Sequence, residues 1–362
     1  IAGSFAIYKM ISHGKQSEHS ELDKSIAVIP FANDSPDKDN EYFCNGMMEE
    51  ILNQLQKIKE LKVKSRTSVE KYRNTDKDIK VIGHELGVSY IMEGSVRKVG
   101  DDVRITAQLI DTKTGNHLWS DTYDWKYTTE IFKYQSGVAK KVAASLNAVI
   151  TPEEKARIDT KPTTEIRAHD LCLKAYGIRD RMFASDDSTF ARNLKIELNI
   201  YNQALEIDPL YTEALNGKAG AFTWQGRYDS AMIYYKKSLE IDPMNPGTWM
   251  GIGYLYQGLN KPDSAYYYIK KGLDHGLNDP WSYLMIGQHL LYFKNEVIGA
   301  LKYFRKAFEA EGGDNWSINT HFCTVFSQIG DYPRALKYAY KALSQSSDCY
   351  SIVGYDYFLY NL

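Results

Sequence analysis

The pentapeptide LEIDP at Leu205–Pro209 decides the fold of the second half of this chain, because it recurs 34 residues later at Leu239–Pro243. Alanines return with nearly the same period, at Ala231, Ala265, Ala300 and Ala335. A period of this length, with a small residue in its second half and a proline at its end, is typical of an array of helical hairpins. Stacked hairpins usually offer a surface that holds another protein. We therefore expect a binding scaffold here and look for catalytic residues elsewhere.

The clearest repeat, residues 212–245, indicates how each hairpin packs. The side chains expected to line its two helices are Leu215, Ala219 and Phe222 on the first and Ala231, Tyr235 and Ser238 on the second. Gly226 supplies the turn between them. Small residues at Ala219, and at Gly253 one repeat on, let paired helices approach closely. No strand pattern follows Glu165, so we predict an all-α solenoid over residues 165–362.

The composition is that of an ordinary globular protein of 362 residues, enough for two or three domains. Hydrophobic residues make up 43% and charged residues 25%, and the net charge is −2. A dedicated nucleic-acid binder needs a basic surface. We therefore expect no nucleic-acid partner for this chain.

The cysteines give no sign of a metal or cofactor site. Cys44, Cys172, Cys323 and Cys349 form no C-x-x-C pair and have no histidine at zinc-ligand spacing. Buried thiols acting as small apolar side chains are the favoured interpretation. A bridge between Cys323 and Cys349 is the alternative. We predict no metal and no cofactor.

The first residues suggest a membrane anchor. Ile1–Ile11 is mostly apolar, although a bilayer takes about 20 such residues to cross. We favour the end of a membrane span over a short buried segment or the end of a signal-peptide core. Residues 12–24 are charged, without apolar periodicity, and are predicted to be a linker.

Residues 25–150 show a mixed pattern that predicts one α/β domain of order β-α-β-α-β-β-β-α. Gly87 and Gly100 are expected to end a helix and to make a hairpin turn. The predicted strands are Ser25–Phe31, Leu61–Thr67, Tyr90–Lys98, Asp101–Ile110 and Leu118–Tyr123, and the predicted helices are Glu41–Ile58, Ile79–Leu86 and Thr129–Val149. Residues 151–164, including TKPTT at Thr160–Thr164, are predicted to be a second linker.

The helical half resembles the tetratricopeptide repeat. The matching positions are Trp249, Ile252, Gly253, Tyr256 and Ala265 in one unit, and Cys323, Phe326, Gly330, Tyr332, Ala335 and Ala342 in another. Four units begin near Thr212, Pro246, Pro280 and Trp316. A degenerate unit precedes them, with Tyr201, Ala204 and Pro209 recognisable and an insertion around Ser185–Ser188. Tyr350–Leu362 is expected to be a capping helix or half a repeat.

The first domain resembles the TolB amino-terminal-like, FlgO-related domain. The segments that carry this resemblance are Ser25–Phe31, Glu41–Leu55, Leu61–Ser68, Ile82–Val88, Ile91–Asp111 and His117–Ser120. In bacterial signalling proteins such a domain often lies between a membrane span and tetratricopeptide repeats, with a cyclase or DNA-binding output domain across the membrane. The resemblance implies architecture and brings no catalytic residues.

Motifs that would signal catalysis fail on inspection. His84-Glu85 lacks the second histidine of a zinc protease, since Val88 stands there. Gly251-x-Gly253 lies on a predicted repeat helix and is expected to be a packing feature. One interpretation of the densest basic set is contact with phospholipid head groups or an acidic partner. We favour a solvated strand edge for it; the set is Lys57, Lys59, Lys62, Lys64, Arg66, Lys71 and Arg73.

The concave face of the repeats is the best candidate site, and its expected lining is aromatic and amide-rich. The candidate residues are Asn216, Trp224, Met250, Tyr254, Gln257, Gln288, Tyr292, Thr320 and Thr324. A charged clamp for a terminal carboxylate is not expected, because Gly217, Gly247 and Gly251 occupy the corresponding positions. For any single aromatic, packing between repeats is an equally good interpretation.

These observations predict a non-enzymatic scaffold or sensor that binds a protein or peptide and is anchored in the bacterial inner membrane, with its soluble part in the periplasm. The alternative is the extracytoplasmic part of a signalling protein whose output domain, an adenylate cyclase or a transcription regulator, lies upstream. A further alternative is a small-ligand site in the α/β domain.

Overall fold

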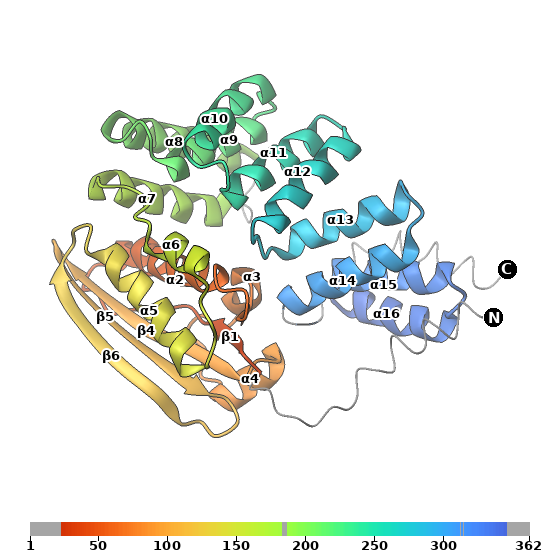
Figure 1. The fold of residues 1–362 in the computed structure, drawn as a ribbon, viewed down its shortest axis with the longest axis horizontal. Helices are drawn as coiled ribbons and strands as arrows, with labels where there is room; N and C mark the ends of the chain where they lie inside the picture. The colour runs from red at the N-terminus through yellow and green to blue at the C-terminus, as the bar shows by residue number, and fades with distance from the viewer. Residues whose placement is uncertain (1–22, 183–186, 312, 314, 346–362) are drawn as a thin grey trace.

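The computed structural model describes residues 23–182, 187–311, 313 and 315–345. Figure 1 shows the α/β domain at the lower left and a series of helices that arches over it, from α7 at the upper left to α14, α15 and α16 at the right. This architecture confirms the predicted fold class, an α/β domain followed by an all-α solenoid of helical hairpins.

The sheet of the α/β domain has the strand order β3-β1-β4-β5-β6, and β2 also pairs with β4. Its strands are β1 (Ser25–Val28), β2 (Ala32–Asn33), β3 (Lys62–Val63), β4 (Tyr90–Val99), β5 (Asp102–Asp111) and β6 (His117–Lys126). The pairs of β1 with β3 and β4 are parallel, and β4-β5-β6 is an antiparallel meander. All residues of β1 are buried, as expected of a central parallel strand. Gly100, at φ 60°, makes the β4–β5 turn as predicted.

Helices cover both faces of this sheet. On one face lie α2 (Glu41–Gln56) and α5 (Ile131–Ser145), and the apolar stripe of α2 is fully buried at Phe43, Met47, Ile51 and Leu55. On the other face lie α3 (Arg66–Glu70) and α4 (Ile79–Leu86), which bury Val69, Ile82 and Leu86 in a cluster with Ala27 of β1 and Ile91 of β4. Gly87 ends α4 in the left-handed region, as predicted.

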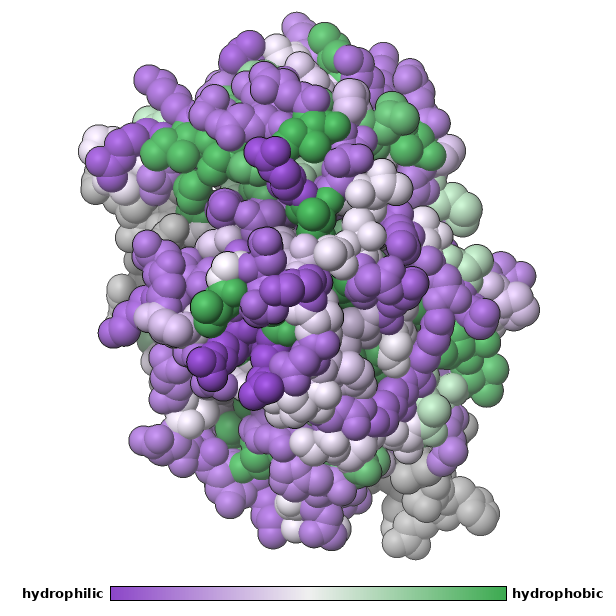
Figure 2. Space-filling view, turned by 90° about the vertical axis from the view of Figure 1, so that its left-hand side faces the viewer, coloured by the Kyte–Doolittle hydropathy of each residue, from purple (hydrophilic) through white to green (hydrophobic). Residues whose placement is uncertain are grey.

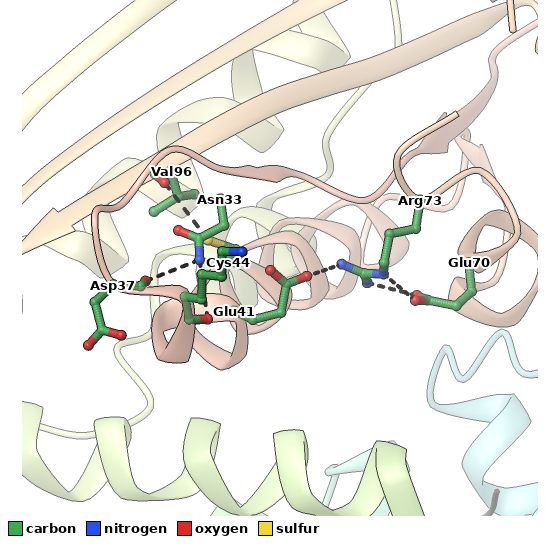
Figure 3. Close-up of polar contacts among 8 residues, drawn as sticks. Asn33, Asp37, Glu41, Cys44, Glu70, Arg73 and Val96 are labelled. Atoms are coloured by element: carbon green, nitrogen blue, oxygen red, sulfur yellow. Dashed lines mark hydrogen bonds and ion pairs between the residues drawn. The ribbon is translucent and has the colours of Figure 1, made fainter. Parts of the chain in front are cut away.

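The segment predicted as the strand Leu61–Thr67 is mostly not a strand. Only Lys62 and Val63 pair with β1, and the chain then turns into α3, whose first turn is capped by the Ser65 hydroxyl. Figure 3 shows what fixes this corner: Arg73, after α3, reaches between Glu70 and Glu41 at the start of α2. The alternation of apolar and charged residues therefore reflects a short strand followed by a helix.

Residues 151–164 are not an extended linker, because they contain the helix α6 (Pro152–Asp159). Thr151 and Glu154 form a reciprocal capping box, and the Glu154 carboxylate also accepts a hydrogen bond from the Lys59 backbone N–H at 3.1 Å. Ile158 is fully buried in the main core. This helix thus packs at the carboxyl end of α2 and brings the chain back over the α/β domain.

The solenoid is a row of antiparallel helix pairs. Its helices are α7 (Ile166–Met182), α8 (Asp187–Ile207), α9 (Thr212–Trp224), α10 (Tyr228–Ile241), α11 (Pro246–Gly258), α12 (Pro262–Asp274), α13 (Pro280–Tyr292), α14 (Val297–Glu311), α15 (Trp316–Gln328) and α16 (Tyr332–Gln345). The pairs from α9 onward begin at the four positions inferred from the sequence, and α7–α8 forms the degenerate unit. Part of its insertion, residues 183–186, and the segment Tyr350–Leu362 lie outside the described residues.

Within the described residues, no helix combines the length and apolar composition that a bilayer crossing requires. Ile1–Ile11 and most of the first predicted linker lie outside the described part of the chain. Cys44, Cys172 and Cys323 are all buried, which agrees with the favoured interpretation of the cysteines as small apolar side chains. Cys349, the partner considered for Cys323, lies outside the described residues.

Candidate functional site

A cleft of about 1990 Å³ runs between the concave side of the solenoid and the helix α2 of the α/β domain. One wall comes from the first helices of the repeat pairs, α7, α9, α11 and α13. The other comes from α2, from α6 and from the segment after α6. The inner side of the solenoid therefore faces a protein wall instead of open solvent. The sequence could not show this wall, because residues far apart in the chain build it.

The structure places most of the predicted groove residues in this cleft. The residues that line it are Asn216, Trp224, Met250, Tyr254, Gln257 and Gln288. Tyr292 is half exposed beyond the cleft, with its hydroxyl 3.3 Å from Nδ1 of His321. Thr320 and Thr324 are buried and donate hydrogen bonds to carbonyls one turn back in α15. The prediction that these threonines form part of a binding surface is wrong, because α15 is buried on nearly every side.

Two of the cleft residues are already engaged in packing. The Thr248 hydroxyl donates to the Asn216 side-chain oxygen at 3.0 Å and lies 2.9 Å from the Ser238 hydroxyl, which ties adjacent repeats together. The Tyr254 hydroxyl donates to Asp279 at 3.3 Å. Burial raises the pKa of Asp279 above its usual range, although hydrogen bonds from Ser282 oppose that effect. Asn216 and Tyr254 therefore shape the wall more than they offer free groups.

Packing explains the glycines at two of the expected clamp positions, because a side chain there would collide with a neighbouring helix. A Cβ at Gly217 would come within 2.2 Å of the Tyr201 ring, and one at Gly251 within 2.6 Å of the Tyr235 ring. Tyrosines of the neighbouring second helices thus fill the space beneath the concave face. Sequence reasoning missed one cation there, Arg179 of α7, which lines the cleft and forms an ion pair with the buried Glu197.

Exposed apolar side chains also line the cleft, and sequence reasoning found only Trp224 among them. The others are Leu210, Ile241, Met244 and Trp281. Leu210 is 67% exposed and Met244 56% exposed, and each follows the proline of a recurring LEIDP segment. That shared repeat position was the signal that could have identified them. Figure 2 shows hydrophobic residues gathered most densely in the upper part of its view, which the solenoid occupies.

The basic set is not one solvated strand face. The Lys64 Nζ donates to the Glu309 carbonyl of α14 at 2.6 Å, and Arg66 forms an ion pair with Glu49 of α2 at 3.3 Å. Arg73 bridges the helices shown in Figure 3. Lys57, Lys59 and Arg66 line the cleft, together with Arg157 and Lys161 from outside the set. The alternation of basic and apolar residues along the sequence suggested one exposed strand face, whereas the basic side chains lie at several different sites.

The two domains also touch at both ends of the cleft. At α7, the Tyr42 hydroxyl donates to Asp170 at 3.0 Å. At α14, the Ser65 backbone N–H donates to the Ala310 carbonyl at 3.0 Å. Between them, the Asn278 side chain donates to the Val63 carbonyl at 3.2 Å, and Arg157 donates to the His275 carbonyl at 3.3 Å. The solenoid thus contacts the α/β domain at several points along its concave side, and the cleft lies between these contacts.

The described residues contain no group of three or more His, Cys, Asp and Glu side chains that could hold a metal ion. Figure 3 places the Cys44 sulfur beside the Val96 carbonyl of β4, at 3.9 Å. Burial raises the pKa of the Cys44 thiol to about 12, so it is protonated at neutral pH and unsuited to nucleophilic attack. Burial lowers the pKa of His321 to about 4. Neither of these two side chains lines the cleft.

Comparison with known families supports the two-part architecture. Residues 212–245 match the tetratricopeptide repeat. Residues 22–141 match the second domain of HilA/YgeH-like transcriptional regulators. The expected TolB-like assignment of the α/β domain stays a prediction, because the match carries a different family description.

Among curated proteins, the chain is similar to "Putative adenylate cyclase 3" of Rhizobium meliloti, with 38% identity over 151 residues. The match covers 42% of this chain and 26% of that protein, so the chain spans about a quarter of the relative's length. Among solved structures, it is similar to PilF of Pseudomonas aeruginosa at 20% identity and a TM-score of 0.41, covering 59% of this chain and 85% of that one.

It is also similar to YrrB, a tetratricopeptide-repeat protein described as having an unusual peptide-binding site, at 17% identity and a TM-score of 0.38. That match covers 57% of this chain and 98% of the other. These structural likenesses concern the fold alone. The helical half of the chain is a solenoid of paired helices, in which residues 212–245 match the tetratricopeptide repeat.

Proposed function

We propose that this chain is a non-enzymatic binding module that holds a peptide segment of a partner protein in the cleft between its two domains. One observation carries the proposal: a cleft of about 1990 Å³ is lined by the exposed apolar side chains Leu210, Trp224, Ile241, Met244 and Trp281. Exposed apolar residues that gather in a hollow favour contact with another molecule. Tetratricopeptide repeats support a protein partner.

Most of the binding free energy would come from a few large side chains. Trp224 is 56% exposed and Trp281 49% exposed, and they lie on the first helices of different repeat pairs. Tryptophans in a concave site commonly dominate the binding free energy of an interface. Met244 can adapt to ligand side chains because its thioether chain is flexible. The amides of Gln257 and Gln288 would meet backbone groups of an extended ligand.

The test uses the full chain and an array of synthetic peptides of about 12 residues, which span about 40 Å when extended. We expect the unaltered chain to bind a subset of the array and the double variant Trp224→Ala/Trp281→Ala to lose that binding by about a hundredfold. Fluorescence anisotropy with the best peptides gives the affinities. The matched control is Phe293→Ala/Tyr340→Ala, which removes two exposed aromatic residues outside the cleft.

Retention of peptide binding by the tryptophan variant would contradict a site in the cleft. An array that shows no binding to the unaltered chain would contradict the proposed function itself. Equal losses in the cleft variant and the control would indicate general damage, and thermal unfolding of each variant checks for that directly.

A second candidate function is the sensing part of a larger signalling protein. The observations that favour it are the match of residues 22–141 to a domain of transcriptional regulators and the similarity to the Rhizobium protein. In this function the cleft would receive the signal, and an output domain elsewhere would act on it. A chimera that carries this chain in place of the matching segment of the Rhizobium protein tests it. Cyclic AMP production that is unchanged by a cleft-binding peptide would count against this function.

We further propose that the chain acts beside the bacterial inner membrane, with its soluble part in the periplasm. The support is the apolar composition of Ile1–Ile11 next to a charged segment. Membrane fractionation of cells that produce the protein, followed by protease treatment of spheroplasts, tests both points. Recovery only in the soluble fraction of the cytoplasm would overturn the proposal.

A further inference from the structure

We propose that the cleft selects acidic peptide segments, whose apolar side chains lie on the solenoid wall and whose carboxylates meet a basic corner on the opposite wall. The basic corner consists of Lys57, Lys59, Arg157 and Lys161. This inference rests on the proposed function and names the chemical class of its partner. It also assigns part of the binding site to the α/β domain and to the segment that follows it.

The structure brings these four cations together at the carboxyl end of α2. Lys57 and Lys59 come directly after α2, Arg157 lies on α6, and Lys161 follows α6. The Lys57 Nζ donates to the Arg157 carbonyl at 3.1 Å, and the Lys59 backbone N–H donates to Glu154 at 3.1 Å. α6 and the end of α2 thus form one corner of the cleft. Glu154, which closes the capping box of α6, also accepts the hydrogen bond that attaches the chain at Lys59 to this helix.

The cations of this corner have no directly paired carboxylate among the described residues, although Glu213, Glu50 and Asp242 act on Lys57 through their charges. Within the described part of the chain, no ion pair joins any of these four side chains to a carboxylate, whereas Arg66 pairs with Glu49 and Arg179 with Glu197. Burial lowers the pKa of Lys57, although the charge of Glu213 opposes that effect; the nearby charge of Arg157 adds to the lowering. Repulsion between cations held close together in a partly buried corner raises the free energy of the unliganded protein, and an anionic ligand would reduce this repulsion.

The facing rim supplies apolar contacts and only a little negative charge. Leu210, Ile241 and Met244 line the cleft beside Glu213 and Asp242. Burial raises the pKa of Glu213, so its charged form is disfavoured. The rim therefore suits a ligand that alternates apolar and acidic residues, as an extended strand can present them on opposite sides.

A peptide fits these features better than another polyanion. A nucleic acid would need cations along the whole path of its phosphates, while here the basic corner is confined to one end of an apolar cleft. Apolar anchors such as Met244 and Trp281 have no counterpart in a phosphate backbone. Charge on one wall and apolar surface on the other match a short acidic segment with hydrophobic side chains.

The test uses three matched sets of synthetic peptides of about 12 residues with identical apolar positions. Their polar positions are all Glu, all Gln or all Lys. With the full chain, we expect the Glu set to bind at least about tenfold more tightly than the Gln set, and the Lys set to bind most weakly. Raising the NaCl concentration from about 0.05 to about 0.5 M should reduce that preference.

The variant Lys59→Glu/Lys161→Glu reverses two exposed charges of the basic corner. It should bring the affinity of the Glu set down by about tenfold and leave the Gln set unchanged. The control Lys236→Glu/Lys302→Glu makes the same change in net charge at exposed positions outside the cleft and should leave the preference intact.

The outcomes separate this inference from the proposed function. Binding of all three sets with equal affinity, lost in Trp224→Ala/Trp281→Ala, would support the cleft as a peptide site and overturn its selectivity for acidic segments. Binding of none of the sets would overturn both. Tighter binding of a single-stranded oligonucleotide than of the Glu set would also overturn the inference, because the corner would then recognise phosphate.

Discussion

His169 of α7 and Glu50 of α2 form an ion pair across the boundary between the solenoid and the α/β domain. His169 is fully buried, and its Nδ1 lies 3.0 Å from the Tyr127 hydroxyl while the ring of Phe132 packs edge-on at 4.9 Å. The Gln135 amide also donates to Glu50. Both ring nitrogens of His169 therefore have partners from the other domain, which fixes the first helix of the solenoid against α2.

Replacement of His169 by Ala should loosen this junction. Breaking a fully buried ion pair costs about 3–5 kcal/mol, and because Glu50 is partly exposed we expect about 2–3 kcal/mol here. Thermal unfolding gives the change in the free energy of unfolding. His84→Ala, at an exposed position on α4, is the control and should change it by less than about 0.5 kcal/mol. Equal effects of the two substitutions would show that the pair adds nothing to stability.

The same pair predicts a pH dependence. Burial by itself would lower the pKa of His169, but the charge and hydrogen bond of Glu50, together with the charges of Glu213 and Asp170, outweigh burial and raise it above the usual 6.5. A histidine whose pKa is raised by folding contributes its full stability below pH 6.5, and that contribution is lost as the pH rises through the folded-state pKa. The melting temperature should therefore fall as the pH rises above 6.5 and through the raised folded-state pKa of His169. His169→Gln should flatten this fall, and an unchanged slope would contradict the assignment.

At the other end of the cleft, Glu311 of α14 holds the turn before α3. Its carboxylate accepts hydrogen bonds from the Thr67 hydroxyl at 3.1 Å and the Ser65 hydroxyl at 3.4 Å. Glu311→Ala should speed amide hydrogen exchange at Ser65, whose N–H donates to Ala310, by about ten- to a hundredfold, as expected for about 1–3 kcal/mol of lost local stability. Glu309→Ala is the control, since Lys64 contacts the backbone carbonyl of Glu309 and not its carboxylate. Faster exchange in the control alone would refute this role.

Burial raises the pKa of Glu311, although hydrogen bonds from Thr67, Asn315 and Ser65 oppose that effect. A carboxyl group with a raised folded-state pKa favours the folded contact at low pH, and this advantage declines as the pH rises from 4.5 through the raised pKa. Protection of the Ser65 amide should therefore decrease over that range. In Glu311→Gln, which keeps an acceptor oxygen and carries no charge, the decrease should disappear.

The repeat architecture could be predicted from the sequence because each hairpin is specified locally. Small residues such as Ala231 and Ala265 recur where helices touch, and glycines recur where the chain must turn, as at Gly226 with φ 70°. Gly87 and Gly100 marked the ends of elements in the α/β domain for the same reason. The role of each of these residues is set by residues close to it in the sequence, so one sequence is enough to recognise it.

The remaining errors have physical causes. α6 buries only Glu154 and Ile158, so it has no apolar period, and its start is marked in the sequence by the capping signal at Thr151–Glu154 and by Pro152 at its first position. Leu61–Thr67 alternates in polarity because a short strand is followed by a capped turn. The wall that faces the concave side, including Lys57 and Glu50 of the α2 region, depends on contacts between distant segments. Those contacts leave no periodic trace in the sequence.

Paired helices approach each other closely at Gly253, whereas Gly137 lies on an open helix face, so the same substitution by alanine should have opposite effects at the two positions. A Cβ at Gly253 would lie 2.3 Å from the Ile269 side chain and 3.2 Å from the Ile269 backbone nitrogen, so α11 and α12 would have to move apart. Gly253→Ala should therefore lower the free energy of unfolding by about 1–3 kcal/mol. Gly137 lies on the exposed side of α5 with no atom within 4 Å of its added Cβ, so Gly137→Ala should raise stability by about 0.5–1 kcal/mol through helix propensity alone. Denaturant unfolding of both variants measures the difference. If Gly253→Ala proved as stabilising as Gly137→Ala, close helix contact could not be the reason that a glycine stands in the repeat.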